Sequence, residues 1–116
     1  MPFKFIPTEL PAIVKEHFQD GYHPSEGLWL VRPLDNGTED CIRRMNDWLR
    51  GEEAPYPLAL SDVIWFGDDG VGNVIGWNPI NQQALLWNPE DEEPWHYGSV
   101  EEIWNFVQSG YQAATP

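Results

Sequence analysis

The stretch DVIWFGDDGVGNVIGW, residues 62–77, places two short apolar runs on either side of a turn rich in glycine and aspartate. The runs DVIWF (62–66) and NVIGW (73–77) are β-branched and aromatic, which is typical of short strands. A third run of this kind, QALLW (83–87), follows the turn-rich sequence NPINQ. Three such strands joined by short loops predict an antiparallel meander.

The turn at 67–72 has a composition that also occurs in ligand-binding loops. A phosphate-binding P-loop needs a Lys and a Ser or Thr after its glycines, and this turn has neither. An EF-hand counted from Asp68 would have glycines at two ligand positions and Pro79 in place of the closing glutamate. A structural turn is therefore favoured, and a small-ligand site is the weaker alternative. The predicted turn residues are Gly67, Asp68, Asp69, Gly70, Gly72 and Asn73.

Three segments show the apolar spacing of amphipathic helices. The first spans residues 9–20 between the capping residue Thr8 and Gly21, and the second spans 39–50 before Gly51. The third begins at Ser99, which forms an S-x-x-E capping box with Glu102, and it ends at Gly110. The predicted buried faces are Leu10, Ile13, Val14, His17 and Phe18, then Cys41, Ile42, Met45, Trp48 and Leu49, and finally Val100, Ile103, Trp104 and Val107.

The segment LWLVR (28–32) predicts one more strand, and NPEDEEPWHYG (88–98) predicts an acidic loop. The resulting order is helix, strand, helix, meander, helix. This order predicts an α+β fold, a mostly antiparallel meander sheet packed against N-terminal and C-terminal helices. A length of 116 residues favours a single domain spanning 1–116.

Charge is distributed very unevenly along the chain, which has a formal net charge of −13. All six Lys and Arg residues lie within the first fifty positions, and eleven acidic residues follow from Gly51 onward without a single Lys or Arg. Such a field repels nucleic acid and anionic lipid and attracts basic partners. We therefore expect no nucleic-acid or membrane partner, although excess acid can also serve solubility alone.

No motif for catalysis, metal binding or cofactor binding stands out. The histidines His17, His23 and His96 lack zinc-site spacing, and His17 on a helical stripe predicts a partly buried core residue. Cys41 lies on an apolar helix face, which predicts an inert buried thiol. No spacing singles out a catalytic carboxylate pair, so we expect neither an enzyme nor a cofactor or metal. A single cysteine and an N-terminus interrupted by prolines favour the cytoplasm.

The acidic run near the C-terminus is the strongest candidate for a binding site. Charge runs are most often solvated loops. The alternative is a recognition patch, in which carboxylates supply long-range attraction and an aromatic residue supplies short-range burial. Most of the seven tryptophans are expected in the core, with Trp95 partly exposed. The candidate partner-binding residues are Glu90, Asp91, Glu92, Glu93 and Trp95.

Several of these segments together resemble the SUKH superfamily. The resemblance rests on LSDVIWFGDDGVGNVIGWNP (60–79), LLWNPED (85–91) and SVEEIWNFVQSG (99–110), and it extends to TELP (8–11). That superfamily joins a fungal cell-wall-synthesis regulator to many bacterial toxin-immunity proteins. The resemblance implies an α+β domain without enzymatic activity. It also implies a partner, a toxin domain that is often a nuclease and therefore basic at its cleft.

Two functions from different classes follow. The first is a cytoplasmic immunity protein that neutralises a cognate toxin by occluding it with an acidic surface. The second is a general protein-interaction or regulatory domain with no toxin partner. An acid–base enzyme is the least favoured, and it would require a pocket that brings two carboxylates together. The sequence predicts no particular oligomeric state.

Overall fold

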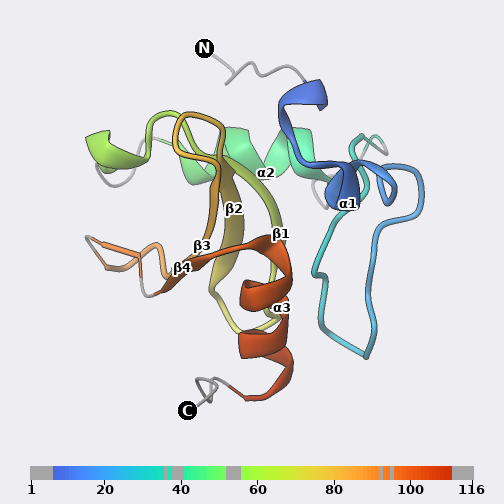
Figure 1. The fold of residues 1–116 in the computed structure, drawn as a ribbon. Coiled ribbons are helices and arrows are strands. Elements are labelled where there is room, and N and C mark those ends of the chain that lie inside the picture. Colours follow the sequence, from blue (N-terminus) through green and yellow to red (C-terminus); the bar gives the residue numbers. More distant parts are fainter. Residues whose placement is uncertain are drawn as a thin grey trace.

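The computed structural model describes residues 7–35, 37, 41–51, 56–91, 93–94 and 96–110. A four-stranded antiparallel sheet lies at the centre of the molecule (Figure 1). Its strands follow each other in chain order, which confirms the predicted meander; they are β1 (Ile64–Asp68), β2 (Val74–Asn78), β3 (Gln83–Trp87) and β4 (His96–Gly98). The fourth strand lies inside the segment predicted as a loop, because three residues are too few to show a strand periodicity.

A β-bulge interrupts the pairing of β1 with β2. Trp65 lies opposite Gly76 and Gly67 lies opposite Ile75, so Phe66 is the extra residue on β1. Gly67 is required here because a Cβ atom at this position would collide with the carbonyl oxygen of Leu30. The bulge therefore allows another segment of the chain to approach β1 closely.

That segment is 28–32, which was predicted to be a strand. The prediction was wrong, because the segment forms only isolated bridges, Tyr22 with Val31 and Ser25 with Leu28. It nevertheless runs along β1, where the Arg32 N–H donates to the Phe66 carbonyl at 2.8 Å and the Asp68 N–H donates to the Trp29 carbonyl at 2.7 Å. The bulge shifts the spacing of these bonds, so no regular ladder forms.

Helix α3 (Val100–Gln108) agrees with its prediction in detail. The Glu102 N–H donates to the Ser99 hydroxyl at 3.1 Å, and the Ser99 N–H donates to the Glu102 carboxylate at 3.2 Å. These two bonds are the predicted capping box. The buried face is also the predicted one, Val100, Ile103, Trp104 and Val107.

Helix α1 (Ala12–Lys15) is much shorter than the predicted helix over 9–20. Its N-cap is Pro11 and not Thr8, and a short 3₁₀ turn, η1 (Pro7–Glu9), precedes it. Pro11 has no N–H to donate and the helix begins only after it. Beyond Lys15 the chain continues in turns up to Gly21, whose positive φ of 78° matches the predicted stop.

Helix α2 (Ile42–Leu49) lies inside the predicted range, with Cys41 as its N-cap. The predicted buried face was wrong at Trp48, which is 56% exposed, whereas Asn46 is fully buried in its place. The Asn46 amide bonds both the N–H and the carbonyl of Trp65 at 2.8 Å, which explains why a polar side chain points inward.

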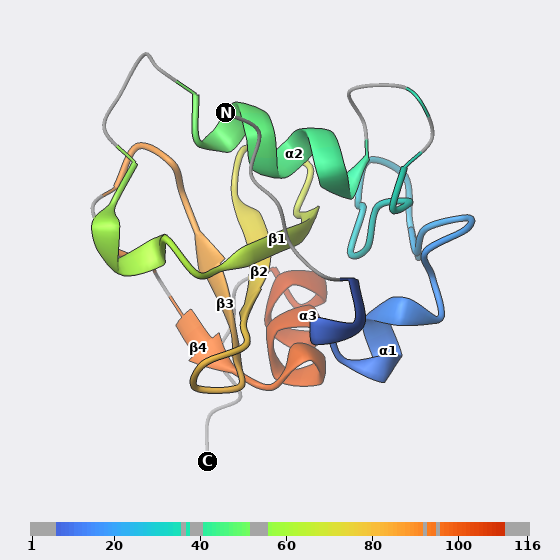
Figure 2. The same cartoon turned by 90° about the horizontal axis from the view of Figure 1, so that it is seen from above.

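Hydrophobic side chains fill both faces of the sheet. Figure 2 shows α2 on one side of the sheet and α1 with α3 on the other. The face toward α1 and α3 carries the larger cluster, to which the sheet contributes Ile64, Phe66, Ile75, Ala84 and Leu86. The opposite face carries a second cluster of buried residues, Met45, Leu60, Val63, Trp65, Val74, Leu85 and Trp87.

Candidate protein-binding surface

The predicted acidic patch lies on the connection between β3 and β4. Its residues Glu90, Asp91 and Glu93 are exposed. The other two candidates, Glu92 and Trp95, lie outside the described residues. We call residues 88–94 the acidic loop.

Short-range hydrogen bonds hold the backbone of the acidic loop. The Asn88 side chain accepts the Glu90 N–H at 2.9 Å, and the Asn88 carbonyl accepts the Asp91 N–H at 2.8 Å. The indole N–H of the buried Trp87 donates to the Asp91 carbonyl at 2.9 Å. These bonds use backbone groups and the Asn88 side chain, so they fix the loop while the Glu90 and Glu93 side chains remain exposed.

An open hollow of about 290 Å³ adjoins the acidic loop. Leu60, Val63 and Leu85 of the second cluster line it together with Asn78 at the end of β2 and Asn81 of the β2–β3 connection. Its rim toward β4 is formed by Glu93, Pro94 and Tyr97. We call this hollow the acidic groove, because a carboxylate stands beside an apolar floor.

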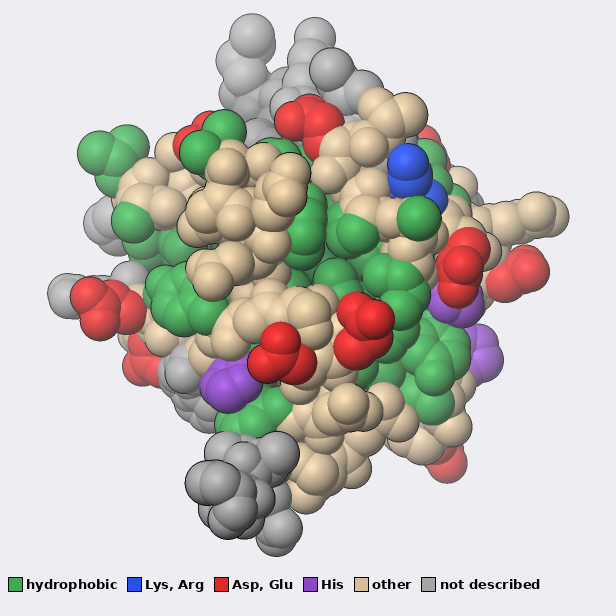
Figure 3. Space-filling view, in the orientation of Figure 1, with side chains coloured by type: hydrophobic (Ala, Val, Ile, Leu, Met, Phe, Trp, Pro, Cys, Tyr) green, Lys and Arg blue, Asp and Glu red, His purple; other side chains and the backbone are tan. Residues whose placement is uncertain are grey.

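Large apolar side chains are exposed at the acidic groove. Tyr97 is 51% exposed, and Leu58 of η2 (Leu58–Leu60) is 87% exposed next to the lining residue Ala59. Figure 3 shows hydrophobic side chains over η2 and β4 on the same side of the molecule as carboxylates of the acidic loop. Exposed aromatic and aliphatic groups beside charges are typical of protein-binding surfaces.

A second hollow of about 300 Å³ lies on the other side of the acidic loop, where Pro89 lines it. Its further lining includes Met45 and the exposed Trp48 of α2, and Val74 of β2. Residues of the acidic loop therefore line both hollows, and each hollow reaches the second hydrophobic cluster.

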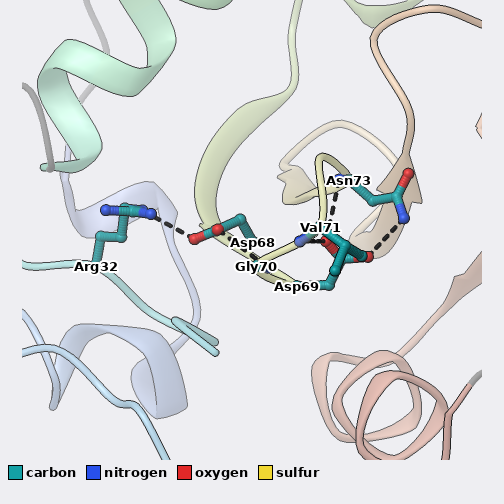
Figure 4. A network of polar contacts seen from close by, with 6 residues as sticks. All are labelled: Arg32, Asp68, Asp69, Gly70, Val71 and Asn73. Carbon is teal, nitrogen blue, oxygen red and sulfur yellow. Dashed lines mark hydrogen bonds and ion pairs between the residues drawn. The ribbon is translucent and has the colours of Figure 1, made fainter. Parts of the chain in front are cut away.

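The predicted turn between β1 and β2 is a structural turn (Figure 4). Asp69 is only 7% exposed and accepts hydrogen bonds from the Val71 N–H at 2.9 Å, from the Asn73 N–H at 3.0 Å and from the Asn73 side-chain amide. Gly70 and Gly72 have positive φ angles of 80° and 107°. Of the six predicted turn residues, Gly67 and Asp68 belong to β1.

Asp68 differs from Asp69 because it pairs with a basic residue. The Arg32 guanidinium donates to its carboxylate at 2.9 Å, and both side chains are mostly buried. Burial raises the pKa of Asp68, and the bonds from Arg32 and from the Gly70 N–H offset part of this rise. Arg32 is thus engaged in an internal ion pair.

The histidines and the cysteine have packing roles. His17 stacks on Tyr22 with the ring centres 4.7 Å apart, and His96 stacks on Phe106 at 4.5 Å. Cys41 is fully buried. Within the part of the chain that the structure describes, no group of three or more His, Cys, Asp or Glu side chains is placed to hold a metal ion.

Sequence reasoning missed Tyr97, Leu58 and the acidic groove. The tripeptide Trp95–Tyr97 directly after the acidic run was an available signal for Tyr97, since aromatic residues beside charge are common in interfaces. The groove itself had no such signal, because it depends on the packing of η2 beside β3. In the sequence, η2 lies 20 residues or more before the acidic loop.

None of the helices among the described residues has the length and apolarity that crossing a bilayer requires. The chain matches no protein-family model, and comparisons with curated proteins and with solved structures also give no significant match.

Proposed function

We propose that this chain is a binding protein without catalytic activity, an immunity protein that neutralises a cognate toxin domain by covering it with the acidic surface. The observation that carries the proposal is the juxtaposition of the exposed Glu90 and Glu93 with the apolar floor of the acidic groove and the exposed Tyr97. The sequence resembles the SUKH superfamily, and in the function that this resemblance implies, the protein acts in the cytoplasm as a stoichiometric inhibitor.

Electrostatics supports a basic protein partner. The acidic loop lies in the half of the sequence that has no Lys or Arg, so no cation close in sequence screens Glu90 and Glu93. Carboxylates arranged in this way attract a basic surface over a long range and accelerate its association. The basic cleft of a nuclease toxin would provide such a surface.

Apolar contacts would then hold the complex together. Buried aromatic side chains contribute most to interface affinity, and charges at the rim contribute mainly to rate and specificity. Tyr97 and the groove floor provide the apolar part, whereas Glu93 stands on the rim. The surface therefore combines both components of a protein interface.

Neither hollow beside the acidic loop favours acid–base catalysis. Among the described residues, Glu93 is the one carboxylate residue in the lining of the acidic groove, and Asp68 is the one in the second hollow. Two close carboxylates are one arrangement for such chemistry, as in glycoside hydrolysis. A binding role accounts better for these linings.

An affinity capture with a matched charge control tests the proposal. Wild type, the variant Glu90→Lys/Glu93→Lys and the variant Asp20→Lys/Glu26→Lys are used as baits in extracts of the source cell. The last two have the same net charge, and Asp20 and Glu26 are exposed residues of the N-terminal part. We expect wild type and the control to retain one basic protein that the loop variant loses.

The captured protein is then identified, and its toxicity is measured with and without this chain in the same cell. Protection by wild type but not by the loop variant is the expected result. A captured protein that is not toxic would favour the alternative, a general interaction or regulatory domain. Equal capture by all three baits would contradict the acidic loop as the binding site. The gene next to this one distinguishes the two functions independently, because an immunity protein is expected beside its toxin.

A further inference from the structure

The two edges of the sheet are treated differently by the rest of the molecule. At the β1 edge, the Asn46 side chain bonds both the N–H and the carbonyl of Trp65, and the segment 29–32 bonds Phe66 and Asp68. The N–H and carbonyl groups of β1 that point away from β2 are therefore already hydrogen-bonded. This is how proteins protect an edge strand from pairing with other chains.

At the β4 edge, the described residues provide no such cover. β4 pairs with β3 through Ala84 with Gly98, Leu85 with Tyr97 and Leu86 with His96, and no described residue outside β3 hydrogen-bonds its backbone. In an antiparallel pair, alternate residues of an edge strand direct their N–H and carbonyl groups outward. With respect to the part of the chain that the structure describes, outward backbone groups of β4 are thus available to another strand.

Side chains around β4 define what kind of strand would fit. Tyr97 lies opposite Leu85, and both line the acidic groove, so the groove opens on the same sheet face beside this edge. A strand added to β4 would place every second side chain over this face. The apolar floor of the groove suits a small aliphatic side chain there.

Carboxylates stand at both ends of β4. Glu93 precedes it on the acidic loop, and the exposed Glu101 and Glu102 follow it in the first turn of α3. Lysines or arginines at the ends of an incoming strand would be attracted by these charges. The complementarity is therefore with a basic extended segment in which apolar and basic residues alternate.

We propose that the protein partner binds by adding such a segment as a fifth strand along β4. This inference rests on the proposed function, because it takes the same acidic surface and names the backbone edge as its recognition element. β4 has three residues, so few backbone bonds form, and affinity also depends on the flanking carboxylates and on Tyr97.

Backbone methylation of a model peptide tests this mode of binding. The probe is acetyl-Lys-Val-Lys-Val-Lys-amide, added to ¹⁵N-labelled protein at low ionic strength. Two versions carry N-methyl groups, one on both valines and one on all three lysines, and each version blocks one edge of the extended peptide. Affinity is measured from NMR shifts, and hydrogen exchange of His96, Tyr97 and Gly98 is followed in parallel.

We expect one methylated peptide to bind about tenfold more weakly and the other to bind nearly as well as the parent, because only one edge faces β4. Hydrogen exchange within β4 should slow on binding. Tyr97→Ala should weaken the parent peptide several-fold, whereas Val71→Ala, which truncates an exposed apolar side chain on the β1–β2 turn, should not.

Equal binding by both methylated peptides, without slower exchange in β4, would overturn strand addition. If the parent peptide then still loses affinity for Glu90→Lys/Glu93→Lys, the acidic surface stands as a binding site and only the mode of binding is wrong. Absence of any binding by the lysine peptide also overturns the inference. Capture of the partner through Glu90 and Glu93 is a separate measurement and would leave the proposed function intact.

Discussion

The turn after β1 and the acidic loop after β3 are both rich in carboxylates, and each follows a strand of the same sheet. The carboxylates of the two connections nevertheless have opposite roles. In the turn, Asp69 is buried and accepts hydrogen bonds from Val71 and Asn73. In the acidic loop, Asn88 makes the corresponding local bonds, and Glu90 and Glu93 are exposed. Composition alone therefore does not distinguish a structural acid from one that is available to a partner.

The physical difference lies in which side chain accepts hydrogen bonds from the backbone N–H groups of the connection. A buried N–H group without a partner is costly, so an acid that caps such groups is fixed by the fold. In the acidic loop Asn88 performs this task, and the Glu90 and Glu93 side chains are exposed where a partner can reach them.

The largest effect is expected for Asp69→Ala. It removes the acceptor of three donors, from Val71 and Asn73, and should lower the free energy of unfolding by roughly 3–5 kcal/mol in chemical denaturation. Glu90→Ala is the matched control and should change it by less than about 0.5 kcal/mol. Similar losses of unfolding free energy in both variants would mean that the acids of the turn and of the acidic loop do not differ in structural role.

Gly70→Ala should have the next largest effect. Gly70 has a φ of 80°, and a Cβ atom there would collide with the carbonyl oxygen of Gly27, so we expect a loss of about 2–4 kcal/mol. Gly72 also has a positive φ but has open space around a Cβ atom, so Gly72→Ala should cost about half as much. Equal thermal stability of the two variants would show that the contact with Gly27 is unimportant.

Trp87→Phe tests the hydrogen bond that holds the acidic loop. The indole N–H donates to the Asp91 carbonyl at 2.9 Å, and loss of this bond should lower the free energy of unfolding by about 1 kcal/mol, to which the smaller buried ring adds a loss of packing. Hydrogen exchange of the Glu90 and Asp91 amides should become faster, whereas that of Asn73 should not change. If exchange in the loop is unaltered, the local bonds of Asn88 suffice to hold it.

The smallest effect is a pH dependence at Asp68. Its pKa is raised above the ordinary value of 3.8 by burial, so the folded state binds this proton more tightly than the unfolded state does. Its contribution to stability is complete below pH 3.8 and is lost as the pH rises through the raised pKa. The free energy of unfolding of wild type should therefore rise relative to that of Asp68→Asn from pH 7 to pH 4. A fall relative to the variant would mean that the Arg32 ion pair outweighs burial.

Periodicity predicted most of the sheet and the last helix. The strands β1 to β3 have dense β-branched and aromatic runs, and the capping box of Ser99 and Glu102 marks the start of α3. These signals are local, and tertiary contacts reinforce them. The predicted acidic loop over 88–98 was right for its acidic part, because its composition contrasts with that of β3, but its last three residues form β4.

The remaining features depend on contacts that are distant in sequence. Burial of Asn46 and exposure of Trp48 follow from the need to bond the Trp65 backbone at an edge strand. The failure of 28–32 to form a regular strand follows from the bulge at Phe66. Neither requirement leaves a mark in the hydrophobic pattern, and for the same reason the acidic groove could not be predicted.

The most direct test of the central claim is the association rate of the captured partner at two ionic strengths. Wild type, Glu90→Lys/Glu93→Lys and the control Asp20→Lys/Glu26→Lys are compared by surface plasmon resonance. Steering by the acidic loop predicts that its reversal slows association about tenfold or more at low salt and reduces the salt dependence, with unchanged stability. Identical association rates for the loop variant and the control would contradict the assignment of the acidic loop as the binding surface.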